Sequence, residues 1–226
     1  MWDWASFLHY IHSPYLLTGA AISLGLSVGA MLIGLVLGLI AAMMRMSERR
    51  WLRLPASGYV WLFRGTPVLV QLIIIYTGLP QLGIQLGVVA SALIGLGLNE
   101  GAYLAEIIRS GVLAVPKGQF EAARAIGMTW PKTMRVVVMP QALRIMIPPL
   151  TNNFITLIQD TSFFLVLGVA ELAFDSQTAA QASSSPLIRW TLYAVELAIY
   201  FAICYPLALI SRRTERRLAR GAAGAQ

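Results

Sequence analysis

The feature that most constrains this chain is a set of long apolar stretches, each ended by positive charge. Residues 18–44 run without a single charged side chain, whereas a helix needs only about 20 apolar residues to cross a bilayer. Arg45, Arg49, Arg50 and Arg53 follow at once. A helix satisfies its own backbone hydrogen bonds in lipid. The sequence therefore predicts an all-α integral membrane protein.

The composition excludes several other classes of protein. Of the 226 residues, 58% are hydrophobic and 12% are charged, about half the charge of a soluble domain. The net charge of +7 lies mainly at the ends of apolar spans, as the positive-inside rule requires, so we expect membrane lipid and no nucleic acid as a partner. Cys204 is the single cysteine, which excludes an internal disulfide. His9 and His12 lack a third ligand, so we expect no metal.

Five apolar segments are predicted to cross the membrane as helices. They are residues 18–44, 55–79, 86–110, 147–167 and 190–210. Together with their connections they form one transmembrane domain, residues 1–226, with no room for a separate soluble enzyme domain.

Basic flanks orient these spans. Residues 45–53, the long connection 111–145 and the tail 211–226 carry most of the arginines and lysines, which places them in the cytoplasm. The aromatic segment 1–17 is then external and interfacial, and residues 168–188 form an external connection. Five spans, an external N-terminus and a cytoplasmic C-terminus agree with every flank.

The second span is interrupted near mid-bilayer by Arg64-Gly65-Thr66-Pro67. Proline removes a backbone donor and glycine loosens the helix. Broken helices at the midplane often hold substrate in transporters, which makes Thr66 a candidate contact. The alternative is a plain kink with Arg64 extended toward the membrane surface.

Polar side chains also lie inside the third and fourth spans. Asn99, Tyr103 and Glu106 share one helix face, with Glu100 beside it, and the fourth span carries a similar stripe. Ionisable groups at this depth are costly and are functional candidates, whereas the alternative is a hydrogen-bonded stripe that fixes helix packing. Glu106 and Arg109 form an i, i+3 pair that we interpret as structural. The candidate substrate-binding residues are Thr66, Asn99, Glu100, Tyr103, Asn153, Asp160 and Thr161.

Residues 121–140, EAARAIGMTWPKTMRVVVMP, form an amphipathic insert between the third and fourth spans. Alanines let another protein surface approach closely, Gly127 is suited to end a helix with a positive φ, and Pro131 is suited to the first turn of a second helix. The pattern predicts a rigid elbow of two short helices.

This insert resembles the cytoplasmic coupling loop of ATP-binding-cassette import permeases, whose pattern begins with Glu-Ala-Ala and a glycine four residues later. Glu121, Ala122, Ala123 and Gly127 match it, and the resemblance implies that they dock ATPase subunits. RGTPVLVQLIIIYTGLP and GAYLAEIIRSGVLAVPKGQFEAARAIG resemble the polar amino-acid branch, the histidine, glutamine and arginine type. Gln159 stands in QDTS where the family commonly has a lysine.

The resemblance implies a bacterial inner-membrane import permease that is not itself an enzyme. It would form a homodimer or heterodimer, receive a polar and possibly cationic amino acid from an external binding protein, and depend on separate ATPase subunits. The chain lacks a Gly-x-x-x-x-Gly-Lys-Ser/Thr motif, so we expect no cofactor here, with ATP bound by the partner. Two alternatives remain: a structural subunit without its own substrate site, and an ion-gradient-driven transporter. Glu196 could face either the helix bundle or the outer membrane interface, and the sequence leaves both open.

Overall fold

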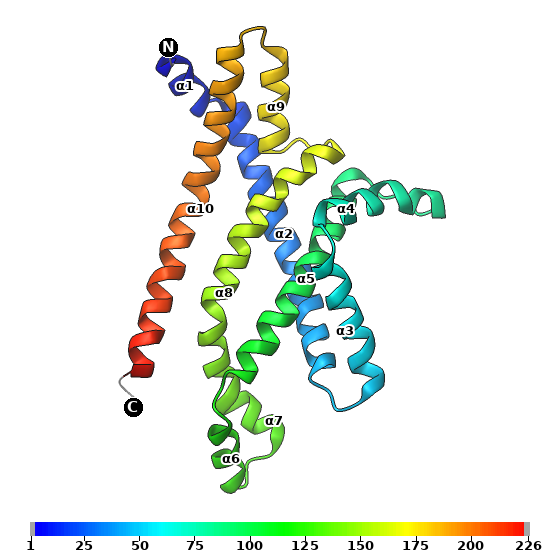
Figure 1. Cartoon of the computed structure of the whole chain (residues 1–226), viewed down its shortest axis with the longest axis vertical. Helices are drawn as coiled ribbons and strands as arrows, with labels where there is room; N and C mark the ends of the chain where they lie inside the picture. The colour runs from blue at the N-terminus through cyan, green and yellow to red at the C-terminus, as the bar shows by residue number, and fades with distance from the viewer. Residues whose placement is uncertain (1–2, 224–226) are drawn as a thin grey trace.

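The computed structural model describes residues 3–223, which form only helices and the turns between them (Figure 1). Residues 1–2 and 224–226, parts of the predicted interfacial segment and tail, lie outside the described residues. The chain starts with α1 (Trp4–Ile11), where the Ser6 amide donates to the Asp3 carboxylate at 3.1 Å. Hydrogen bonds from the Ser6 hydroxyl and amide lower the pKa of Asp3.

Two long helices, α2 (Pro14–Arg45) and α5 (Val88–Leu113), pack closely along the middle of the fold. Glycines make this approach possible. A Cβ added to Gly34 would lie 2.6 Å from the Glu100 Cγ, and one added to Gly38 would lie 2.7 Å from the Leu104 Cβ. Gly34 and Gly38 of the first apolar segment therefore face α5 and let the two helices pack closely.

The second apolar segment breaks into two helices. α3 (Arg50–Gly65) and the helical segment Val68–Leu82, which begins with α4 (Val68–Ile73), meet at 107°. Thr66 between them is extended, with φ −127° and ψ 149°, which suits a residue before proline. The interruption is thus a full break rather than a mild kink.

The elbow consists of α6 (Lys117–Ala125) and α7 (Trp130–Thr133), and it leads through a π-helical turn into α8 (Met139–Asp160). The fourth span was predicted to begin at residue 147, but α8 already begins at Met139, so Pro148 and Pro149 lie inside the helix. A proline inside a helix removes the hydrogen bond of its own nitrogen, and its ring crowds the carbonyl four residues before it. The preceding turns are held by tertiary packing, since Ala142 and Met146 are buried.

The end of the molecule opposite the elbow is tied together by Glu171. Its carboxylate accepts hydrogen bonds from the Ser23 hydroxyl at 3.0 Å, the Phe174 amide at 2.9 Å and the Tyr200 hydroxyl at 3.2 Å. These bonds join α2, the N-terminus of α9 (Leu172–Ala182) and α10 (Pro186–Ala223). A buried carboxylate is thus fully partnered where three helices meet.

Within residues 3–223, three helices, α2, α5 and α10, are long and apolar enough to cross a membrane. The number rises to five if each of two bent pairs counts as one span. The N-terminus and α9 lie at one end of the molecule, whereas the C-terminus, α6 and α7 lie at the other (Figure 1).

Candidate functional site

A cavity of about 360 Å³ opens beside the break between α3 and α4. Three elements form its walls: the break itself, the middle of α5 and the second half of α8. The volume is suited to one small molecule. We call this space the acidic cavity, and its lining residues are Thr66, Pro67, Val68, Asn99, Glu100, Tyr103, Asn153, Thr156 and Asp160.

The structure brings the predicted site residues together with one exception. Thr161 does not line the acidic cavity: it is fully buried, and its hydroxyl donates to the Ile158 carbonyl at 2.7 Å. The helix changes at this residue from α to 3₁₀, in the turn Thr161–Leu167. Thr161 follows Asp160 directly, and successive side chains of a helix point about 100–120° apart around its axis, so Thr161 lies off the face that carries Asp160.

A collar of side-chain amides holds the broken backbone. The Gln71 amide donates to the Phe63 carbonyl at 2.9 Å, the Thr66 carbonyl at 3.0 Å and the Thr66 hydroxyl at 2.8 Å. The Asn99 amide donates to the Phe63 carbonyl at 3.1 Å and to the Gln71 Oε1 at 2.9 Å. The amides replace helical bonds that the break removes, which satisfies carbonyls in an apolar region.

The collar changes the roles available to two predicted residues. Both amide hydrogens of Asn99 are used within the protein, so only its Oδ1 remains available to a ligand. The Thr66 hydroxyl donates to the Leu62 carbonyl at 2.7 Å, so its proton is not free for a substrate carboxylate. Both residues mainly hold the shape of the break.

Two carboxylates give the acidic cavity its charge. Glu100 is 4% exposed, and it accepts a hydrogen bond from the Asn153 amide. Asp160 has no hydrogen-bond partner among the described residues and lines the same space from α8. The lining includes no lysine or arginine of the described chain. Two carboxylates without a cation are suited to bind a positively charged group.

The elbow has the geometry that its sequence predicts. Gly127 has φ +80°, its amide donates to the Arg124 carbonyl at 2.9 Å, and the Met128 amide donates to the Ala123 carbonyl at 3.1 Å. This pairing is the Schellman ending of a helix. Glu121 and Ala122 are exposed, whereas Ala123 is 4% exposed and packs against this chain.

No three histidine, cysteine, aspartate or glutamate side chains gather as a metal site within residues 3–223.

Residues 34–220 match the family model described as binding-protein-dependent transport system inner membrane component. The chain belongs to this family. The permease relatives include the L-cystine transport system permease protein TcyB of Bacillus subtilis (strain 168), 44% identical over 92% of this chain and 88% of that protein.

Other comparisons agree with this membership. The glutamine transport system permease protein GlnP of Escherichia coli (strain K12) is 38% identical over 96% of this chain and 97% of that protein. A solved structure of an amino acid ABC transporter with histidines superposes with a TM-score of 0.87 at 36% identity, covering 96% of this chain and 99% of that chain. The MetNI methionine transporter, at 22% identity and a TM-score of 0.70, shares the fold over 88% of this chain and 95% of that chain.

Gln71 is the residue of this permease that sequence reasoning missed. It lies in the apolar run VLVQLIII, and a buried amide needs partners. Its position four residues after Pro67 was the available signal, because an amide there is within reach of carbonyls that the break frees. Its partner Asn99 lies 28 positions away, which the sequence alone does not reveal.

Proposed function

We propose that this chain is the permease subunit of an ATP-driven importer of polar amino acids, and that the acidic cavity holds the amino acid in transit. The observation that carries the proposal is the pair Glu100 and Asp160 beside a broken helix, with no neighbouring cation in the lining. An ammonium or guanidinium group neutralises such a pair. The two carboxylates favour a substrate whose side chain is also cationic.

We further propose five membrane spans, with the N-terminus external and the C-terminus cytoplasmic. Counting each bent pair as one span gives five crossings. The arginine-bearing segments after α2, in the elbow and in the C-terminal part of α10 lie toward one end of the molecule (Figure 1), and the positive-inside rule assigns that end to the cytoplasm.

The elbow of α6 and α7 is proposed as the docking site for ATPase subunits. Its exposed Glu121 and Ala122 and its rigid turn at Gly127 support this role. Phe120 of the elbow packs against the buried cluster that contains Ala42 of α2 and Val112 of α5, so movement of the elbow would be passed to the ends of those helices. An external amino-acid-binding protein and a second permease subunit complete the proposed system.

The test is uptake of labelled amino acids into vesicles that contain the permease with its ATPase subunits. Asp160→Asn and Glu100→Gln keep the side-chain shape but remove a charge. Loss of a buried charge partner costs a few kcal/mol, about a hundredfold in affinity, so each variant should lose most uptake while a pull-down still recovers the ATPase.

Glu196→Gln is the matched control, because Glu196 is half-buried on α10 and does not line the acidic cavity. We expect it to transport like the wild type. Wild-type rates and unchanged half-saturation in both cavity variants would show that these carboxylates fix helix packing and do not bind substrate.

A further inference from the structure

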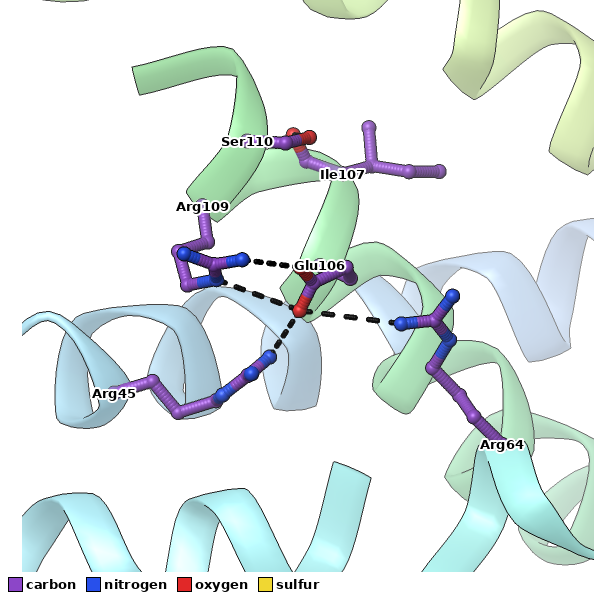
Figure 2. Close-up of polar contacts among 6 residues, drawn as sticks. All are labelled: Arg45, Arg64, Glu106, Ile107, Arg109 and Ser110. Carbon is purple, nitrogen blue, oxygen red and sulfur yellow. Dashed lines mark hydrogen bonds and ion pairs between the residues drawn. The ribbon is translucent and has the colours of Figure 1, made fainter. Parts of the chain in front are cut away.

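Four charged side chains from three helices meet next to the acidic cavity (Figure 2). Glu106 on α5 pairs with Arg45 at the end of α2 and with Arg109 one turn further along α5. Arg64, in the last turn of α3, approaches the same carboxylate with its Nη1 3.9 Å from the Glu106 Oε2. We call these four residues the Glu106 cluster.

The Glu106 cluster carries an excess of positive charge. Three guanidinium groups face one carboxylate, and arginine does not lose its proton in proteins. Arg45 and Arg109 already bind both oxygens of Glu106. The cluster therefore lacks negative charge, and a second anion would relieve repulsion among its cations.

Arg64 is the member that is free to receive such an anion. Its 3.9 Å separation from Glu106 exceeds a hydrogen-bond distance, and its guanidinium lies 5.2 Å from the centre of the Tyr103 ring. Its side chain is 41% exposed. No hydrogen bond to its guanidinium occurs among the described residues, so its planar fork is available for a carboxylate.

Arg64 opens into a second cavity of about 380 Å³, the basic cavity. Tyr103 lines both the acidic and the basic cavity, and Gly65 in the basic wall adjoins Thr66 in the acidic wall. The two spaces thus share one side chain and the helix break. The residues that line the basic cavity are Arg45, Val60, Trp61, Arg64, Gly65, Tyr103 and Glu106.

We infer that the basic cavity is a second subsite, which binds the carboxylate of the amino acid after it leaves the acidic cavity. This inference rests on the proposed function for the identity of its occupant. Arg64 would grip the carboxylate, while Glu106 in the same wall favours a ligand that also carries a positive group. A lipid phosphate offers the same oxyanion chemistry. The amino acid is favoured as the occupant because the basic cavity shares a wall with the acidic cavity.

The arrangement divides the recognition of a zwitterion between two neighbouring spaces of opposite charge. The acidic cavity holds the cationic groups of the amino acid first, and the basic cavity holds its carboxylate after the amino acid has left the acidic cavity. Two partial sites bind each end of the ligand less tightly than one complete site would, which allows a transported solute to leave. Tyr103, 37% exposed between them, forms their common wall.

The experiment uses Trp61 as a reporter, since it lines the basic cavity. The full permease–ATPase complex is placed in phosphatidylcholine nanodiscs, and the Trp61 signal is obtained by difference from Trp61→Phe. Iodide quenches this signal, and acetate is titrated as the carboxylate probe. We expect acetate to shield Trp61 saturably, whereas methylammonium chloride, corrected against sodium chloride, should not.

Arg64→Gln should weaken the acetate affinity about tenfold or more, the contribution of one hydrogen bond to a charged group. Arg64→Lys keeps the charge but lacks the planar guanidinium, so its acetate affinity should lie between those of the wild type and Arg64→Gln. Arg53→Gln, an exposed change on the same helix, is the matched control and should bind acetate like the wild type. A pull-down of the ATPase checks that each variant assembles.

Unsaturable shielding by acetate, or equal affinity in Arg64→Gln and the wild type, would overturn the subsite. Shielding by phosphatidylglycerol discs without any response to acetate would also overturn it, because the occupant would then be a lipid. Acetate binding that persists in Asp160→Asn and Glu100→Gln supports the basic cavity whether or not those variants transport. Failure of the proposed function is thereby separated from failure of this inference.

Discussion

Replacing Gln71 by leucine tests whether the amide collar holds the break between α3 and α4. The change keeps the volume of the side chain roughly constant but removes its donors and its acceptor. Phe63 keeps one bond, from the Asn99 amide at 3.1 Å. The Thr66 carbonyl loses its donor, and Asn99 loses the acceptor of its second hydrogen.

The magnitude follows from these two orphaned groups. A buried polar group without a partner costs about 1–3 kcal/mol. Asn99 is 6% exposed, so its N–H carries the full penalty, whereas Thr66 borders the acidic cavity and is open to water. We therefore expect a destabilisation of about 2–4 kcal/mol, together with a weaker affinity for substrate as the break shifts.

The assay is thermal unfolding of the purified complex in detergent, combined with equilibrium binding of a labelled amino acid. Gln81→Leu is the matched control, because Gln81 is exposed and donates only one weak bond, to the Thr77 carbonyl at 3.4 Å. It should change stability by less than about 0.5 kcal/mol. Gln71→Glu keeps an acceptor for the Asn99 amide but, once ionised, cannot donate to the Phe63 and Thr66 carbonyls, so it tests the donor half of the collar and should also destabilise the break.

The same melting temperature and the same substrate affinity in Gln71→Leu and Gln81→Leu would refute the collar. In that case the backbone at Thr66 and Pro67 would hold its shape through its own dihedral preferences. Lower stability with unchanged affinity would limit the collar to a structural role.

Two further predictions concern the elbow and the topology. Gly127→Asp should abolish uptake without preventing membrane insertion, because φ +80° is strained for a residue with a side chain. Gly118→Asp is the control, since a Cβ there meets nothing within 4 Å and the backbone has no positive φ. Normal transport by Gly127→Asp would remove the coupling role. In a Cys204→Ser background, a cysteine at Ser184 should react with an impermeant thiol reagent in intact cells, whereas one at Thr129 should not. The reverse labelling pattern would contradict five spans with an external N-terminus.

Local signals made several features predictable from sequence. The break at Gly65 and Pro67 depends on two residue types that weaken a helix, here with only one residue between them, and the turn at Gly127 depends on a glycine at a helix end. Glu100 and Asp160 are conspicuous because carboxylates inside apolar spans are energetically costly and mark functional sites. These features require no knowledge of the rest of the fold.

Features that depend on distant partners were beyond the sequence. Glu106 was paired with Arg109, its neighbour on the helix, but Arg45 lies 61 positions away and reaches the same carboxylate. Thr161 was placed beside Asp160 because it follows Asp160 in the chain, but successive helical side chains lie on different faces, and the packing of α8 turns the face of Asp160 toward the cavity. Tertiary packing decides both cases, and the spacing of residues along the chain does not predict it.

ATP-driven uptake is the measurement that tests the central claim most directly. The permease and its ATPase subunits are reconstituted in proteoliposomes with the binding protein and a labelled cationic amino acid, and ATP is supplied on the elbow side. The account predicts uptake that requires hydrolysable ATP, persists when ionophores collapse ion gradients, and is lost in the Glu100→Gln, Asp160→Asn double variant. Uptake that ionophores abolish, or that the double variant retains in full, would contradict it.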